Sequence, residues 1–133
     1  MKKMLSILCT LVLVCTAFGY NVLAAENDYG IMPVAAKTSS SRLTDGVYWY
    51  NFYLECTSLI TYAQADSDSW RMMDIYLIAY TDWGNQVHNS GSGAYWTQVV
   101  VNNPNNNEMI TGCEADYSVQ GSAIEEHLEV FYN

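Results

Sequence analysis

Mostly apolar side chains alternate with polar ones along the segment from Met109 to Val119, more regularly than anywhere else in the chain. In a β-strand, successive side chains point to opposite faces of the sheet, so a period of two separates a buried face from a wet one. The segment is therefore predicted to be a half-buried strand. Its expected inner face consists of Met109, Thr111, Cys113, Ala115, Tyr117 and Val119, and its outer face of Glu114, Asp116, Ser118 and Gln120.

Shorter segments rich in aromatic and β-branched residues recur between residue 46 and the C-terminus, divided by Gly, Asn, Asp and Ser. This arrangement is typical of an all-β domain built from short strands and tight turns. We expect the fold to be a small antiparallel β-sandwich of about seven strands with one inter-sheet disulfide. The predicted strands lie within 46–62, 71–81, 94–102 and 109–119, and the predicted turns at 65–69, 82–85, 89–93 and 102–107.

Two segments fit a helix as well as a strand. Residues 122–125 match a helix capping box, and Ile124, Leu128 and Phe131 then follow at helical spacing. A strand pattern also fits this stretch, and the bulky β-forming residues at its end favour the strand. Residues 69–80 carry the same ambiguity, so the sequence leaves helix and strand open for both segments.

The first 24 residues have the three parts of a secretory signal peptide. Lys2 and Lys3 give a positive start, an uncharged apolar run follows, and Ala24 ends a short segment typical of a cleavage site. The apolar run is shorter than the roughly 20 residues that a membrane-spanning helix needs. We therefore expect a secreted, extracellular protein, with retention at the cell wall left open. The expected parts are a signal peptide over 1–24, a leader over 25–44 that is flexible or a weak edge strand, and a β-sandwich domain over 45–133.

Removal of the signal peptide would leave three cationic residues, Lys37, Arg42 and Arg71, against all 14 acidic residues, a net charge of −11. A domain with this charge repels phosphate backbones and anionic lipids. We therefore expect no nucleic-acid partner and no stable insertion into a membrane. The expected partner is an extracellular glycan or protein.

Four cysteines occur in the chain, and two of them, Cys9 and Cys15, would leave with the signal peptide. The remaining pair, Cys56 and Cys113, falls on the apolar side of two distant predicted strands. An even number of cysteines in an exported domain indicates a disulfide. Two buried free thiols are the alternative, because the pairing rule depends on the cellular compartment and not on geometry.

All four tryptophans and most tyrosines lie beyond the signal peptide. Exposed aromatic rings stack on the apolar faces of sugars, whereas buried rings would only fill the core of a domain that is poor in Phe and Leu. Trp83, next to Gly84 in a predicted turn, is the aromatic residue most expected to be exposed. The candidate ligand-binding residues are Trp83, Trp96, Trp49 and Tyr95.

Motifs for catalysis or metal binding are weak. Two histidines, His88 and His127, do not make a zinc site without further ligands, and the acidic turns at Asp66, Asp68 and Asp82 lack a full calcium loop. We expect no enzymatic activity, no metal and no cofactor. A small carboxylate-dependent hydrolase is kept as an alternative, with candidate carboxylates Glu55, Asp74, Glu114 and Asp116.

Short aromatic stretches mark both ends of the predicted domain, at residues 46–51 (GVYWYN) and 131–133 (FYN). They resemble the small secreted bacteriocins of the lactococcin type. The resemblance implies a short aromatic β-sandwich that acts as a secreted effector, which we keep as an alternative function. The chain departs from that pattern in its acidic charge and its predicted disulfide.

The order of Cys56, Trp70 and Cys113 is similar to the core of an immunoglobulin-like domain. In that core a tryptophan packs against an inter-sheet disulfide, and a tyrosine stands two residues before the second cysteine. Here Thr111 occupies the tyrosine position. The sequence therefore lacks this part of the immunoglobulin-like pattern.

Overall fold

A computed structural model describes residues 35–132 of the chain. The predicted signal peptide, and the part of the predicted leader over 25–34, lie outside the described residues. Within 35–132 the chain forms eight β-strands. No helix long and apolar enough to cross a bilayer occurs in this described part.

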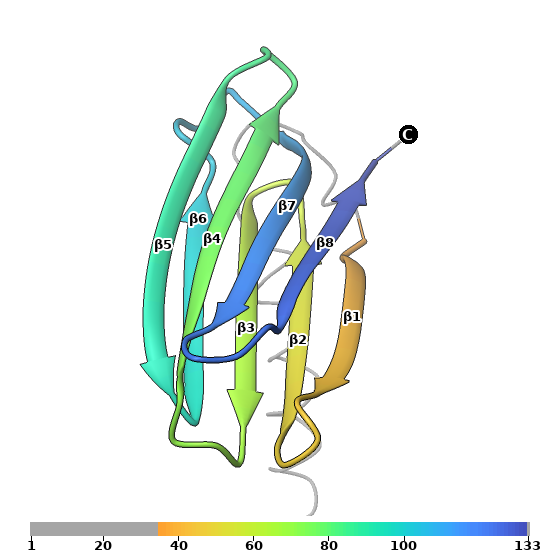
Figure 1. Ribbon diagram of the computed structural model, residues 1–133. Helices are drawn as coiled ribbons and strands as arrows, with labels where there is room; N and C mark the ends of the chain where they lie inside the picture. The colour runs from red at the N-terminus through yellow and green to blue at the C-terminus, as the bar shows by residue number, and fades with distance from the viewer. Residues whose placement is uncertain (1–34, 133) are drawn as a thin grey trace, which may run out of the picture. The chain divides into compact units, whose positions relative to one another are not determined.

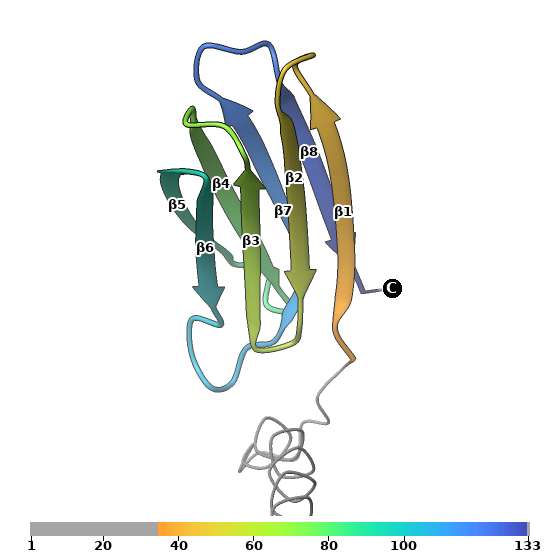
Figure 2. The same cartoon turned by 90° about the horizontal axis from the view of Figure 1, so that it is seen from below.

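The strands form two antiparallel four-stranded sheets that pack face to face (Figure 1). Sheet A has the order β1-β2-β3-β6 and sheet B the order β5-β4-β7-β8. Figure 2 shows sheet A in front of sheet B. The strands are β1 (Lys37–Thr44), β2 (Trp49–Cys56), β3 (Ile60–Ser67), β4 (Met72–Thr81), β5 (Gln86–Ala94), β6 (Trp96–Asn102), β7 (Ile110–Val119) and β8 (Glu125–Phe131).

The core lies between the sheets, because every second residue of the central strands points inward. Large and small side chains from the two sheets alternate in this layer, with Phe52 of sheet A and Tyr117 of sheet B at its centre. Their ring centroids are 4.9 Å apart. The Tyr117 hydroxyl donates a 2.7 Å hydrogen bond to the Tyr53 carbonyl of the opposite sheet. The two sheets are thus joined by aromatic packing and by a polar contact at one place.

The edge strands of the two sheets lie next to each other on both sides of the sandwich. On one side, the Lys37 amino group of β1 donates a 2.9 Å hydrogen bond to the Phe131 carbonyl of β8. On the other side, the Asn89 amide of β5 donates a 3.0 Å hydrogen bond to the Val100 carbonyl of β6. These contacts occupy edge groups that an open sheet would present to other chains.

The predicted turn over 89–93 is wrong, because these residues lie inside β5. Its glycines allow the edge strands β5 and β6 to approach each other closely. A Cβ atom on Gly93 would stand 2.7 Å from the Trp96 carbonyl oxygen, and one on Gly91 would stand 3.0 Å from a Val99 methyl group. The chain turns from β5 to β6 at a single residue, Tyr95.

Both segments that the sequence left open are strands, since residues 72–81 form β4 and residues 125–131 form β8. Residues 37–44, predicted as a leader or a weak edge strand, form the edge strand β1. The sheet therefore begins at Lys37 and not at residue 45. Trp70 lies in the connection after β3 and is largely exposed, so it is not the core tryptophan of an immunoglobulin-like domain.

In β7 the predicted alternation is confirmed from Cys113 to Val119. Before Cys113 it fails, because the register with β4 shifts between Tyr80 and Thr81. Thr111 falls in this irregularity, and Ile110 is the buried residue at the start of the strand. An extra residue in a strand reverses the faces of all residues before it.

Loss of the polar contact between the sheets should destabilise the fold. Tyr117→Phe keeps the ring and removes the hydroxyl that bonds to Tyr53, so we expect the free energy of unfolding to fall by about 1 kcal/mol. Denaturant unfolding measures this change. Tyr95→Phe, which removes an exposed hydroxyl, is the matched control and should leave stability within about 0.5 kcal/mol. Equal effects of the two changes would contradict the assigned role of the Tyr117 hydroxyl.

Candidate functional site

One end of the sandwich carries most of the exposed apolar side chains. Four connections meet there, at 45–48, 68–71, Tyr95 and 120–124, at the lower end of Figure 1. Six of the ten large apolar side chains that are exposed within residues 35–132 belong to this end: Val47, Trp49, Trp70, Met72, Tyr95 and Trp96. Clusters of this kind mark interaction sites more often than scattered exposed residues do.

Four aromatic residues of this end, Trp49, Trp70, Tyr95 and Trp96, are called the aromatic surface below. Their exposed fractions are 47%, 68%, 57% and 55%. They come from three separate parts of the chain, since Trp49 begins β2, Trp70 lies between β3 and β4, and the other two join β5 to β6. Tertiary structure alone brings them to one end.

The end of β3 holds these parts together. The Ser67 hydroxyl donates a 2.7 Å hydrogen bond to the Trp49 carbonyl, and the Ser67 N–H donates a 2.9 Å bond to the Tyr95 carbonyl. Asp66, the residue before, pairs with Trp96 across the sheet. Trp49 and Trp96 thus lie on the strands β2 and β6 on either side of β3, and these two strands are about 10 Å apart across the sheet. Two rings on strands so placed suit an extended ligand.

Tyr95 has a backbone conformation that side chains rarely adopt, with φ at 65°. It is the one non-glycine residue with positive φ among residues 35–132. Such a conformation costs free energy of order 1–3 kcal/mol and is common at ligand sites. Here it lets the chain cross from sheet B to sheet A at one residue while the tyrosine ring stays exposed.

Polar side chains lie beside the aromatic surface on the outer face of sheet A. A shallow hollow of about 440 Å³ there is lined by Arg42, Asn51, Tyr53, Asp66 and neighbouring residues. The Asn51 amide donates a 2.8 Å hydrogen bond to an Asp66 oxygen. The Arg42 guanidinium lies 4.5 Å from the centre of the Trp49 ring. Amides, carboxylates and aromatic rings therefore alternate over a short stretch of the sheet.

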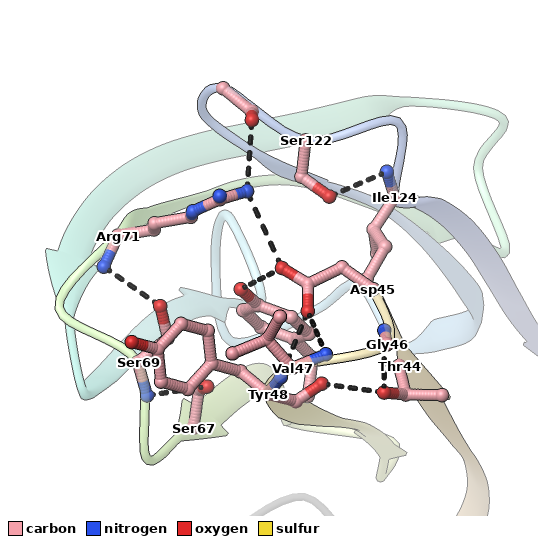
Figure 3. A network of polar contacts seen from close by, with 12 residues as sticks. Thr44, Asp45, Gly46, Val47, Tyr48, Ser67, Ser69, Arg71, Ser122 and Ile124 are labelled. Atoms are coloured by element: carbon pink, nitrogen blue, oxygen red, sulfur yellow. Dashed lines mark hydrogen bonds and ion pairs between the residues drawn. The ribbon is translucent and has the colours of Figure 1, made fainter.

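The connections at this end are held by the Asp45 carboxylate (Figure 3). One oxygen accepts hydrogen bonds from the N–H groups of Val47 at 3.0 Å and Tyr48 at 2.8 Å. The other accepts the Tyr50 hydroxyl at 3.0 Å and lies 3.3 Å from the Arg71 guanidinium. The N–H of Tyr48 is the main cause of the lowered pKa of Asp45. This carboxylate thus fixes the turn that leads into Trp49.

Arg71 extends the network to the other connections. The same guanidinium nitrogen that faces Asp45 donates a 2.8 Å hydrogen bond to the Gly121 carbonyl. The Arg71 N–H donates to the Ser69 hydroxyl at 3.1 Å (Figure 3). Trp70 stands between these two anchored residues, so its backbone is held on both sides while its ring faces solvent.

The outer face of sheet B is acidic and contains a hollow of about 890 Å³. Three of the four candidate catalytic carboxylates, Asp74, Glu114 and Asp116, point to this face, whereas Glu55 lies on sheet A. Asp116 lies 2.7 Å from the His127 ring nitrogen, a contact that raises the pKa of His127.

Glu114, like Asp116, is a hydrolase candidate whose carboxylate already has a hydrogen-bond partner. It accepts a 2.7 Å hydrogen bond from the Tyr80 hydroxyl, which is the main cause of the raised pKa of Tyr80, about 12. Glu114 and Asp116 are alternate residues of one strand, so they lie on the same open face and do not oppose each other across a cleft. This arrangement gives no support to glycoside hydrolysis by the pair.

No group of three or more His, Cys, Asp or Glu side chains within residues 35–132 is arranged to hold a metal ion. Asp82 lies at the opposite end from Asp66 and Asp68, where it accepts a hydrogen bond from the Met109 N–H. The three acidic turn residues therefore do not share a calcium site.

Three of the four candidate ligand-binding residues, Trp49, Tyr95 and Trp96, lie together on the aromatic surface. Trp83 is exposed as well, but in the β4–β5 turn at the other end of the sandwich. Sequence reasoning missed Trp70. Its position directly after a run of Asp and Ser residues was the available signal, because such runs form solvated connections.

Searches for similar proteins give no match to a protein-family model, to a curated protein or to a solved structure. The resemblance to the lactococcin-type bacteriocins therefore stays a prediction from the sequence.

Removal of the Asp45 carboxylate should loosen the aromatic end and change the acid stability of the protein. The folded pKa of Asp45 lies below the ordinary value of 3.8, so its contribution is complete above that value and is lost as pH falls through the folded pKa. We expect Asp45→Ala to lower the thermal midpoint at neutral pH, and the difference from the parent protein to shrink in acid. Glu129→Gln, on the exposed face of β8, is the control. A difference that does not vary with pH would contradict this role.

Proposed function

We propose that this protein is a secreted, non-enzymatic binding module that holds an extracellular glycan on its aromatic surface. One observation carries the proposal, which is that all four tryptophans of the chain are exposed by 47% or more. A tryptophan ring that stays exposed to water does not contribute the large favourable free energy that its burial would provide. A domain that fills its core with other residues and keeps every tryptophan outside has surface rings available for a ligand.

A glycan fits this surface better than a protein partner does. Protein interfaces have a closely packed apolar centre that excludes water. Here Trp49 and Trp96 stand on the two strands that flank β3, and the polar outer face between them offers Asn51 of β2 and Asp66 of β3. Sugars present apolar ring faces and hydroxyl groups in alternation, and they match such a sequence of aromatic and polar groups. The two rings belong to the strands on either side of β3, so together they suit an oligosaccharide and not a single sugar.

Rigidity of the site supports the same proposal. Trp49 and Trp96 stand on strands of one sheet, and the Asp45 network anchors the neighbouring connections. A preformed site loses little conformational entropy when it binds a ligand. Weak stacking contacts are then sufficient for useful affinity.

Truncation of the aromatic rings tests the proposal. Trp49→Ala and Trp96→Ala should each weaken binding to a glycan found on an array by about tenfold, or about 1.4 kcal/mol. Trp83→Ala, which removes an exposed ring at the opposite end, is the matched control and should bind as the parent does. Calorimetric titration measures the affinities. Unchanged binding by both site variants would reject the aromatic surface.

A mixing assay with intact Gram-positive cells separates this function from the bacteriocin-like alternative. Bound protein and surviving cells are scored together. Binding without killing supports the module, and killing of a related strain would favour a secreted effector. If the protein neither binds to nor kills the cells, the search for a ligand turns to soluble extracellular partners.

We also propose that Cys56 and Cys113 form an inter-sheet disulfide in the exported protein. The two residues are free thiols in the structure, and both are fully buried, on β2 of sheet A and on β7 of sheet B. Both side chains point into the layer between the sheets, and the interaction with the neighbouring Cys113 thiol is the main cause of the raised pKa of Cys56. Two neighbouring thiols on facing strands need little movement to be joined. Thiol–disulfide exchange with a disulfide oxidant would form the bond and leave the oxidant as two thiols.

Thiol titration tests the disulfide. The exported protein, unfolded without reductant, should show no reactive thiol, and it should show thiols after reduction. Loss of the bond in Cys56→Ser with Cys113→Ser should lower the free energy of unfolding by about 4 kcal/mol in the chain-entropy model. Two reactive thiols before reduction would refute the bond.

A further inference from the structure

We propose that the glycan bound by the aromatic surface carries free amino groups, so that its sugars are positively charged. This inference rests on the proposed function and adds the charge class of the ligand. It depends on the two carboxylates that lie among the rings, neither of which forms an ion pair within residues 35–132.

Two carboxylates lie within the aromatic surface. Asp66 is the direct cross-strand partner of Trp96, and side chains in such pairs have Cβ atoms about 5 Å apart on the same face. Asp68 begins the connection that leads to Trp70, and its oxygen lies 3.4 Å from the Trp49 backbone nitrogen. Each tryptophan that flanks β3 therefore has a carboxylate next to it.

Neither carboxylate has a cationic partner within residues 35–132. The ion pairs in that part of the chain are Arg71 with Asp45 and His127 with Asp116. Asp66 accepts a hydrogen bond from the neutral Asn51 amide. A ligand ammonium group would therefore meet carboxylates whose charge is not yet balanced, and it would also interact with the tryptophan rings through their negative faces.

The site already contains one example of this recognition. The Arg42 guanidinium stacks 4.5 Å from the Trp49 ring centre, on the β1 side of the surface. Trp96, on the β6 side, has the Asp66 carboxylate beside it and no such cation among the described residues. The amino sugar is therefore expected to bind on the Trp96 side of the aromatic surface.

Charge over the whole chain acts in the same direction. The formal net charge is −9. An acidic surface raises the local concentration of cationic polymers and lowers that of anionic ones, such as uronic-acid or sulfated glycans. Among glycans of equal shape, those with ammonium groups are therefore favoured both at a distance and at the site.

Glucosamine oligomers and N-acetylglucosamine oligomers of equal length test the inference, because acetylation removes the charge and keeps the sugar ring. We expect the glucosamine oligomer to bind roughly two- to fivefold more tightly at low salt, the range for exposed ion pairs, and added salt to remove the difference. Asp66→Asn, which removes the carboxylate beside Trp96, should reduce the preference. Glu129→Gln, which makes the same change in net charge on the far sheet, should keep it.

Each contrary result has a distinct meaning. Equal affinity for the two oligomers, or tighter binding of an anionic glycan such as hyaluronan, would overturn the charge assignment and leave glycan binding standing. Binding of oligolysine as tight as that of the glucosamine oligomer would show that charge alone suffices and would overturn the sugar assignment. Failure of every glycan to bind would overturn this inference together with the proposed function.

Discussion

Interlocking of large and small side chains between the two sheets is the constraint on which the rest of this structure depends. Alanines of β3, β4 and β7 are fully buried, and they make room for the few large rings of the core. Tyr50, Phe52 and Tyr117 are the large aromatic residues in that layer. Since three rings and a set of aliphatic side chains fill the narrow space, no position remains inside for a tryptophan. The composition of the core therefore decides which aromatic residues are left for the surface.

Local pattern was sufficient to predict most of the architecture. The alternation from Cys113 to Val119, the antiparallel sheets and the turn before Asn85 all follow from side-chain period and turn chemistry. The pattern failed where tertiary contacts decide conformation. The Gly-rich stretch of β5 has the composition of a turn, yet it is a strand because its glycines let β6 approach closely. The shift opposite Thr111 depends on a partner strand far away in sequence, so no local signal could reveal it.

The candidate site could be predicted only in its residue types. Trp49, Tyr95 and Trp96 are predicted as candidates because they are aromatic, and nothing in the sequence indicates that Trp83 lies at the opposite end from them. Two turns lie at the same end of the sandwich when an even number of strands separates them. A single turn missed in the sequence changes that number by one and moves the predicted turn to the opposite end. The order of Cys56, Trp70 and Cys113 resembles an immunoglobulin-like core, yet Trp70 is 68% exposed. The next residue, Arg71, pairs with Asp45 of another connection, a contact between residues far apart in the sequence.

The division of aromatic residues between inside and outside also separates two optical reporters. Indole emission in this protein comes from rings in contact with water, and three of the four indoles lie at the aromatic end. Such emission would change when a ligand covers the rings, as the proposed glycan would. The phenol rings of Tyr50 and Tyr117, both buried, respond to the opening of the core instead. Tryptophan fluorescence would thus report on ligand binding at this end, and near-ultraviolet tyrosine signals would report on the core.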